Sequence, residues 1–182
     1  MSNIPIDFDV VIPHSNEEEF IDKALALGYK QIIFLTDNIN YLKPSTTKLG
    51  VKTAYLIKNV EEISRAKKKF DYTFALAERK YFESNVDFII DAEYSDRKDS
   101  FHYKATSLNQ VHAELAKVNN ITLVFNFTKL ISDPLSVKGK MSQNAILIKK
   151  YKLNYAVFSL ALTPAMMRSR NVLNALETVL GF

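Results

Sequence analysis

The sequence predicts an α/β fold built on a parallel sheet. Seven short apolar runs, rich in β-branched and aromatic residues, alternate with segments of helical spacing. This alternation is typical of strands joined by helical crossovers, which leave the strands parallel. Runs such as IIFL and LVFNF are nearly continuous in apolar residues, as expected for strands that are covered on both faces. The pattern fits either an open doubly wound sheet or a barrel.

The predicted strands recur along the whole chain, and no long flexible linker or internal repeat separates them. A length of 182 residues is ordinary for one domain, so we expect a single domain over residues 1–182. The predicted strands cover residues 8–12, 31–35, 51–57, 71–77, 86–90, 121–127 and 155–162.

Start and stop signals delimit the predicted helices. Ser15 or Asn16 can cap a helix over residues 17–28, and Gly28 is well placed to end it. Further helices are predicted over residues 141–152 and 170–180, and a weaker, highly charged one over residues 59–69.

The segment SLNQVHAELAKVNN has the clearest amphipathic pattern in the chain. Thr106 or Ser107 is expected to cap this helix. His112 lies inside it and is expected to be structural or solvent-facing. The apolar residues three and four apart, which predict its buried face, are Leu108, Val111, Leu115 and Val118.

The composition excludes several classes of function. The chain has no cysteine, so disulfides, thiolate metal sites and cysteine nucleophiles are excluded. With four glycines in all, it has no glycine-rich phosphate loop. It has neither a run of about 20 apolar residues nor a signal-peptide pattern, so we expect a soluble, cytoplasmic protein. The net charge of +4 permits a polyanionic partner but is only weakly diagnostic.

Charged residues gather where the predicted strands end. The carboxyl ends of parallel strands share one edge, which is the usual functional face of such folds. The stretch DRKDSFHYK, residues 96–104, contributes many of these charges. The other residues expected at this edge include Asp37, Lys58, Glu78, Arg79, Lys80, Asp91, Lys129, Arg168 and Arg170.

A catalytic metal site is poorly supported by the residue types present. Such a site needs several converging His and acidic ligands, yet the chain has three histidines and no His-x-His pair. The carboxylates after the fifth strand follow no metal-loop spacing. We therefore predict no catalytic residue and no metal ligand. The alternative, a metal-dependent phosphoesterase, would use Asp9, Asp91, Glu93 and His102.

Nucleic-acid binding requires cations for phosphates, with aromatic and amide groups nearby. Arg97, Lys98, His102, Tyr103 and Lys104 supply that mixture, although a solvated charged surface would show the same pattern. The run AKKKF at residues 66–70 is typical of such a solvated surface.

Two further cations stand just before the last predicted helix. Arg168 and Arg170 flank Ser169, a possible cap, and their charge opposes the dipole of that helix end. Cations in this position suggest an external anion.

The stretch VDFIIDAEYSDRKDSFHYKATSLNQVHAELAKVNNITLVFNFTKLI resembles the centre of ribonuclease P protein component 3, the PHP-like barrel subunit of ribonuclease P. The likeness includes a strand that ends in aspartate, the triplet Arg97-Lys98-Asp99, the pair Leu108-Asn109 and the turn Asn119-Asn120. FDVVIPHSNEEEFIDKALALGYKQIIFL and YAVFSLAL with MRSRNVLNALETVLGF resemble its flanks. The resemblance implies a TIM-barrel-like fold.

The resemblance also implies a non-catalytic protein that supports RNA-catalysed removal of the 5′ leader from precursor tRNA. Its implied partners are ribonuclease P RNA and a small α/β subunit of the Pop type, with precursor tRNA met indirectly. Mg²⁺ would serve the RNA, and the protein would bind no cofactor. The implied RNA-binding residues are Arg97, Lys98, His102, Lys104, Asn109, Arg168 and Arg170, with Asp99 orienting Arg97 or Lys98.

The chain departs from the family at its end. It stops at Gly181-Phe182, where the family usually continues with another strand or helix. The eighth position of the barrel is therefore expected to be open, truncated or filled by a partner, which would leave a sheet edge to be covered. A pure protein-interaction scaffold stays open as a third function.

Overall fold

The computed structural model describes residues 7–46, 48–94 and 104–182. Within them, seven parallel strands form one sheet in sequence order, and all seven predicted strands are present. The strands are β1 (Phe8–Val11), β2 (Gln31–Thr36), β3 (Gly50–Leu56), β4 (Tyr72–Leu76), β5 (Phe88–Ile90), β6 (Thr122–Asn126) and β7 (Asn154–Phe158).

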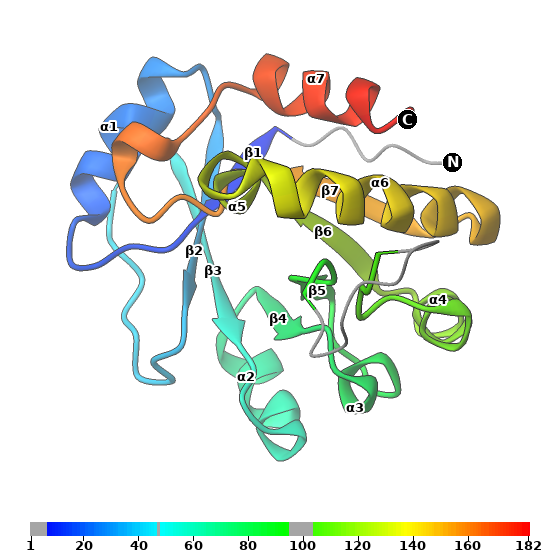
Figure 1. The fold of residues 1–182 in the computed structure, drawn as a ribbon. Helices are drawn as coiled ribbons and strands as arrows, with labels where there is room; N and C mark the ends of the chain where they lie inside the picture. Colours follow the sequence, from blue (N-terminus) through cyan, green and yellow to red (C-terminus); the bar gives the residue numbers. More distant parts are fainter. Residues whose placement is uncertain (1–6, 47, 95–103) are drawn as a thin grey trace.

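Helices connect most of these strands and lie on the outside of the sheet (Figure 1). They are α1 (Glu17–Ala26), α2 (Ile63–Lys69), α3 (Arg79–Phe82), α4 (Gln110–Val118), α5 (Phe127–Ser132), α6 (Pro134–Tyr151) and α7 (Arg170–Val179), with short 3-10 turns η1 (Val60–Glu62) and η2 (Pro164–Met166). Among the described residues, no helix combines the length and apolar character that crossing a bilayer requires.

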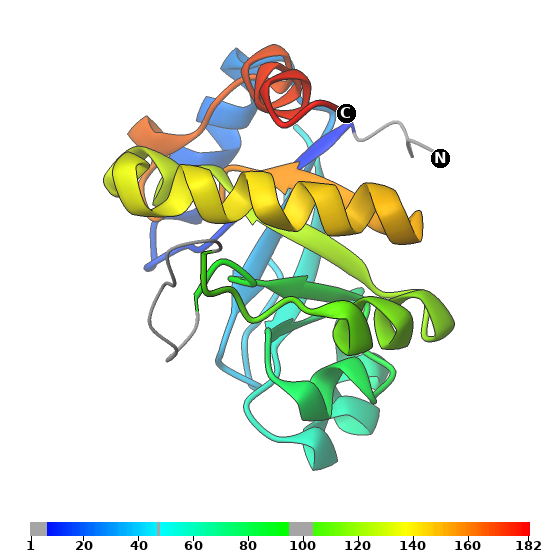
Figure 2. The same cartoon turned by 45° about the vertical axis from the view of Figure 1, so that its right-hand side comes forward.

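The sheet curls into a nearly closed barrel, as the two views in Figures 1 and 2 show. Inward-facing side chains from successive strands, among them Val10, Ile33, Ala54, Phe74 and Phe158, fill the interior. Separate apolar clusters lie between the sheet and the helices. The predicted TIM-barrel-like fold is thus confirmed, with seven strands in its wall.

The β1–β7 seam, formed by β1 and residues 157–161, closes the barrel within the chain. Val11 makes a parallel bridge with Ala161, whose carbonyl accepts a hydrogen bond of 2.9 Å from the Ile12 amide. Beneath this bridge, the fully buried Asp9 carboxylate accepts hydrogen bonds from the amide and hydroxyl of Ser159 and from the Val10 amide. Within the described residues, β1 and the segment after β7 thus meet directly at the position where an eighth strand was expected to be missing.

The α4 helix differs from its prediction in both its cap and its buried face. Asn109, not Thr106 or Ser107, is the cap residue. The small residues Ala113 and Ala116 are buried, because they allow close packing against the neighbouring helices. The predicted face is wrong for two of its members, since Val111 is 52% exposed and Val118 is 80% exposed.

The ends of the other helices agree in part with the sequence. Gly28 takes a left-handed φ of +81° just after α1, as predicted. Asn16 is the cap residue there, but its side-chain oxygen accepts from the His14 amide outside the helix. The α6 helix begins at Pro134, well before the predicted residue 141, because the Asp133 side chain caps it by accepting from the Ser136 amide.

The connection between β2 and β3 stands apart from all the others. Residues 37–49 contain no helix among those described, whereas every other pair of consecutive strands is joined through at least one. The outer layer of the barrel is therefore thinner beside β3.

Candidate nucleic-acid interface

The carboxyl edge of β5 presents a paired cation and carboxylate. Asp91 follows the strand with a left-handed φ of 61°, a conformation that Asp tolerates better than most residues. The Lys129 ammonium, from the first turn of α5, donates to Asp91 and lies 4.4 Å from the centre of the Tyr94 ring. Because β5 and β6 are neighbours in the sheet, their ends bring these three side chains together.

A pocket of about 290 Å³ opens beside this pair. Tyr94 is 42% exposed and offers part of its ring to the pocket. The pocket therefore combines an aromatic face, on which a base can stack, with a cation that is paired to Asp91 and with carboxylates that can accept hydrogen bonds from a base. Its lining residues are Leu76, Ala77, Glu78, Asp91, Tyr94, Ser107 and Lys129.

Glu93 and Asn144 form a buried polar layer behind the edge, and both are at most 2% exposed. Burial, with a further contribution from the Asp91 charge, raises the pKa of the Glu93 carboxyl to about 7. Both amide atoms of Asn144 and one carboxylate oxygen of Asp91 are buried without a hydrogen-bond partner among the described residues. The sequence pattern singled out Asp91 and Glu93 but gave no signal for Asn144, which looks like an ordinary polar residue of α6.

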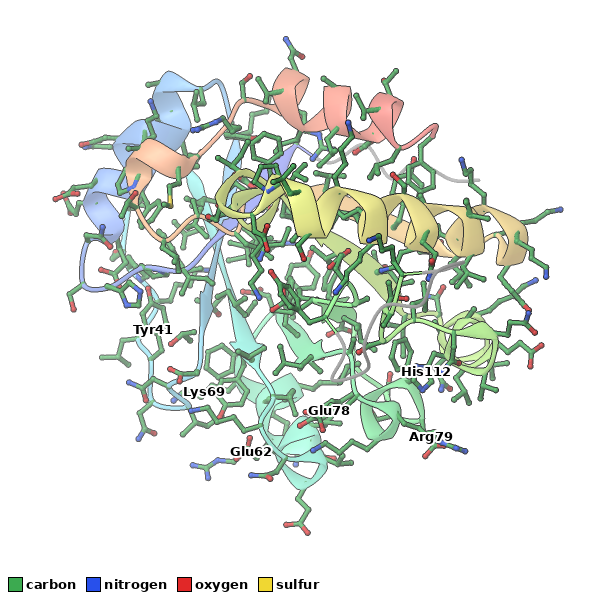
Figure 3. The ribbon with its side chains drawn as sticks, viewed as in Figure 1. Tyr41, Glu62, Lys69, Glu78, Arg79 and His112 are labelled. Atoms are coloured by element: carbon green, nitrogen blue, oxygen red, sulfur yellow. The ribbon has the colours of Figure 1, made fainter. Side chains whose placement is uncertain are left out.

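Most other cations predicted at this edge are already neutralised. Lys58 pairs with Asp37 at 2.8 Å, Lys80 with Glu78 at 2.8 Å, and Arg79 with Glu83 at 2.8 Å. The hydrogen bond from Lys58 holds the pKa of the Asp37 carboxyl below its usual value. These exposed pairs add little stability, but they reduce the charge available to a polyanion. Figure 3 shows Glu78 and Arg79 close to the outer surface.

The core of the predicted RNA-binding loop, with Arg97, Lys98, Asp99 and His102, lies outside the described residues. Its C-terminal end is fixed in place. The Lys104 amide donates to Gln143 Oε1 at 2.9 Å, and the Gln143 amide donates to the Lys104 carbonyl at 2.7 Å. The loop therefore returns to α6 at a defined point, beside a second pocket of about 350 Å³ lined by Lys104, Asn109, Ile146 and others.

Asn109 and His112 hold the start of α4. The Asn109 side-chain oxygen accepts from the His112 amide at 2.9 Å, which caps the helix. The His112 ring stacks on Phe82 with centroids 4.5 Å apart, and its Nδ1 lies 2.6 Å from the Ser107 carbonyl oxygen. His112 thus has a structural role, as expected, whereas the predicted RNA contact of Asn109 competes with its capping role.

Arg168 and Arg170 stand at the start of α7, directly after the turn η2 that packs against α1. Figure 1 shows α1 and α7 on one flank of the molecule. Arg170 donates to the Val157 carbonyl at 3.0 Å and pairs with Glu177, while Arg168 donates to the Ala165 and Met167 carbonyls. The Arg170 charge thus has an internal partner in Glu177, so it does not require an external anion. Of the other predicted RNA-binding residues that the structure describes, Lys104 is hydrogen-bonded to α6 and Asn109 caps α4, so neither belongs to the segment that carries the two arginines.

A metal centre of the predicted alternative type does not form among the described residues, where no group of three His, Asp or Glu side chains could hold an ion. The Asp9 carboxylate accepts hydrogen bonds from Ser159, and the Asp91 carboxylate accepts one from Lys129. His102, the fourth member of that alternative set, lies outside the described part of the chain.

Comparison with known proteins gives one informative likeness. No protein-family model matches the chain, and no curated protein does. A chain in the cryo-EM structure of archaeal ribonuclease P with mature tRNA superposes with a TM-score of 0.73 at 18% identity, over 94% of this chain and 82% of that one. At this identity the likeness establishes the shared barrel fold.

Two weaker likenesses do not inform the fold. A crystal structure of an uncharacterized protein reaches a TM-score of 0.49 at 10% identity, over 87% of this chain and 65% of that one. Dihydropteroate synthase from Thermus thermophilus reaches 0.38 at 8% identity, over 94% and 93%.

Proposed function

We propose that this protein is an RNA-binding, non-catalytic subunit of ribonuclease P, corresponding to its PHP-like component 3. The observation that carries the proposal is the fold likeness, over 94% of the chain, to a chain of archaeal ribonuclease P with mature tRNA. The sequence resemblance to the same family is an independent support, because it rests on short motifs and not on the fold.

In this proposal the barrel is a rigid support for the RNA. The loop of residues 95–103 supplies Arg97, Lys98 and His102, and it is held at Lys104 by the two hydrogen bonds to Gln143. Cations on a fixed frame neutralise phosphates and lower the repulsion within a folded RNA. The RNA performs the cleavage of precursor tRNA, with Mg²⁺ bound by the RNA and a Pop-type protein as neighbour in a cytoplasmic particle.

Reconstituted cleavage of precursor tRNA tests the proposal. The double change Arg97→Ala with Lys98→Ala should raise the Mg²⁺ concentration needed for half-maximal cleavage and weaken RNA binding by about tenfold or more, because two phosphate contacts are lost. The matched control is Lys117→Ala with Lys150→Ala, which removes two exposed charges from α4 and α6. Equal stimulation by the wild type and the Arg97/Lys98 variant would exclude this loop as the contact.

The alternative functions give opposite results in simpler assays. An isolated protein that binds Mn²⁺ stoichiometrically and hydrolyses a phosphodiester without RNA would be a phosphoesterase. A protein that binds the Pop-type subunit but no RNA would be a scaffold. The proposed subunit should instead bind RNA and show no phosphodiesterase turnover alone.

A further inference from the structure

A cleft of about 490 Å³ lies on the outer face of β3, where the helical layer is interrupted. The helix-free connection between β2 and β3 forms one wall, and the end of α2 forms the other. Figure 3 shows Tyr41 and Lys69, from these two walls, on the same flank of the molecule. The lining residues are Tyr41, Leu42, Lys43, Thr53, Lys68, Lys69, Phe70 and Asp71.

Three lysines from two separate segments border this cleft. Among the described residues, neither Lys43 nor Lys68 nor Lys69 takes part in an ion pair or a side-chain hydrogen bond, and all three are exposed. The neighbouring Lys67 provides a contrast, because it reaches Asp87 and Asn85 at 3.1 Å each. Of the three lysines in α2, Lys67 therefore has an internal partner, whereas Lys68 and Lys69 border the cleft.

The single carboxylate that lines the cleft makes no ion pair with these lysines among the described residues, and three lysines with one carboxylate leave the lining with a net positive charge. Asp71 Oδ2 accepts a hydrogen bond of 2.8 Å from the Thr53 amide and lies 3.4 Å from the Thr53 hydroxyl. That carboxylate therefore serves to join the start of β4 to β3. The dipole of α2 favours lysines in its last turn, which accounts for Lys68 and Lys69. It does not account for Lys43, which comes from a different segment.

We propose that this cleft binds the phosphate backbone of RNA, as a second contact separate from the loop of residues 95–103. The inference rests on the proposed RNA-binding function and names a new surface for it. Lysines are flexible point charges that suit phosphates and read no sequence. The cleft therefore adds affinity and orientation without base specificity. The run at residues 66–70, interpreted above as a solvated surface, contributes two of its three cations.

A salt titration of RNA binding tests the cleft. The probes are a ribonuclease P RNA transcript and single-stranded poly(U), with binding measured by fluorescence anisotropy. The variant Lys43→Gln, Lys68→Gln, Lys69→Gln should lower the slope of log affinity against log salt by about two to three, since each phosphate contact contributes about 0.7 to 0.9. Its affinity at low salt should fall by at least about tenfold.

The matched control removes three charges that do not meet in one place. Lys23→Gln, Lys117→Gln and Lys150→Gln lie on α1, α4 and α6, so this variant has the same net charge as the cleft variant. Its slope should change by less than about one, because scattered charges contact the RNA only transiently. The unfolding transition of both variants should match that of the wild type.

The other outcomes would overturn either the cleft proposal or the proposed function. If the cleft variant matches the scattered variant while Arg97→Ala with Lys98→Ala weakens binding, the cleft proposal fails and the proposed function stands. If the wild type binds neither RNA at low salt, the proposed function fails. If polyglutamate binds the wild type more tightly than RNA does, and only through the cleft lysines, then the cleft is a site for an acidic protein.

Discussion

Two groups of buried polar side chains differ in how completely they are satisfied. At the β1–β7 seam, both Asp9 oxygens accept hydrogen bonds from Val10 and Ser159. At the carboxyl edge of β5, by contrast, one Asp91 oxygen and both Asn144 amide atoms have no partner among the described residues. Buried polar groups are nearly always paired, so each exception needs an explanation.

The two regions therefore differ in what surrounds their buried polar groups. The unmatched atoms at the carboxyl edge are buried, so they do not contact a ligand directly in this conformation. The seam is complete, and its polar groups are used to close the wall of the barrel. The carboxyl edge combines unmatched polar atoms with a pocket, an exposed Tyr94 ring and a fixed loop end. This contrast agrees with a functional face at the carboxyl ends of the strands.

Removing the Asp9 carboxylate should cause the largest loss of stability. Asp9→Ala leaves the amides of Val10 and Ser159 buried without an acceptor, and it leaves the Ser159 hydroxyl only its longer bond of 3.4 Å to the Val10 carbonyl. We expect the free energy of unfolding to fall by about 3 kcal/mol, measured by urea denaturation. A loss below about 1 kcal/mol would show that the seam does not hold the barrel together.

The change Asp9→Asn is the control, because an amide oxygen can accept the same backbone bonds. Burial raises the pKa of the Asp9 carboxyl from 3.8 to about 6, which means that the folded state favours its protonated form. This contribution to stability is present below pH 3.8 and is lost as pH rises through about 6. The stability of Asp9→Asn relative to wild type should therefore increase between about pH 4 and 7.

Breaking the Arg170 contacts should have an intermediate effect. Arg170→Ala removes the donor to the Val157 carbonyl and leaves Glu177 half-buried without its cation. We expect a loss of about 2 kcal/mol in urea denaturation. Such a loss would show that Arg170 stabilises the fold, in contrast to the side chains at the carboxyl edge of β5.

A second variant decides whether Arg170 also meets RNA, as the sequence predicts. Glu177→Gln disturbs the same pair from its other side and keeps the arginine. If Arg170 only supports the fold, each variant should change RNA affinity by no more than the small effect of its one-unit change in net charge, once folding is complete. A tenfold greater loss of affinity for Arg170→Ala would show that this arginine contacts the RNA. The contrast between a region that holds the fold and the carboxyl edge of β5 would then no longer hold.

Changing Asn109 should have the smallest effect on stability and the most informative effect on binding. Asn109→Ala removes the cap of α4, which is worth about 1 kcal/mol. Asn109→Asp keeps the cap but adds a negative charge, so stability should remain near wild type in urea denaturation. If Asn109 also contacts RNA, Asn109→Asp should weaken RNA binding severalfold. Unchanged binding would limit Asn109 to capping.

The sequence predicts the strands well, because each is a short run dominated by β-branched and aromatic residues, even where Asp9 or Lys52 interrupts it. It cannot predict barrel closure, because closure depends on contacts such as Asp9 with Ser159 that join distant positions. The α3 and α5 helices are only a few residues long and carry little periodicity, so neither was predicted. The buried face of α4 was wrong in part because alanines, which weigh little in an apolar pattern, make its closest contacts.

The candidate site was predictable only in outline. Strand order brings Asp91 and Lys129 to one edge, as the pattern indicated. The pattern could not show that Arg170 has an internal carboxylate partner, or that Lys43 joins Lys68 and Lys69 at a cleft. These relations depend on side-chain direction and on a missing helix, and neither is encoded in local spacing.

Asp9 and Ser159, which join the two ends of the barrel wall, are 150 residues apart in the sequence. This separation affects the order in which parts of the barrel form while the chain is synthesised. The first strand leaves the ribosome long before its partner exists, so Asp9 must remain hydrated while β2 to β6 assemble. Contacts of such long sequence separation form late, since they close the largest loop. We therefore expect the seam side of β1 to stay unpaired until β7 has been synthesised.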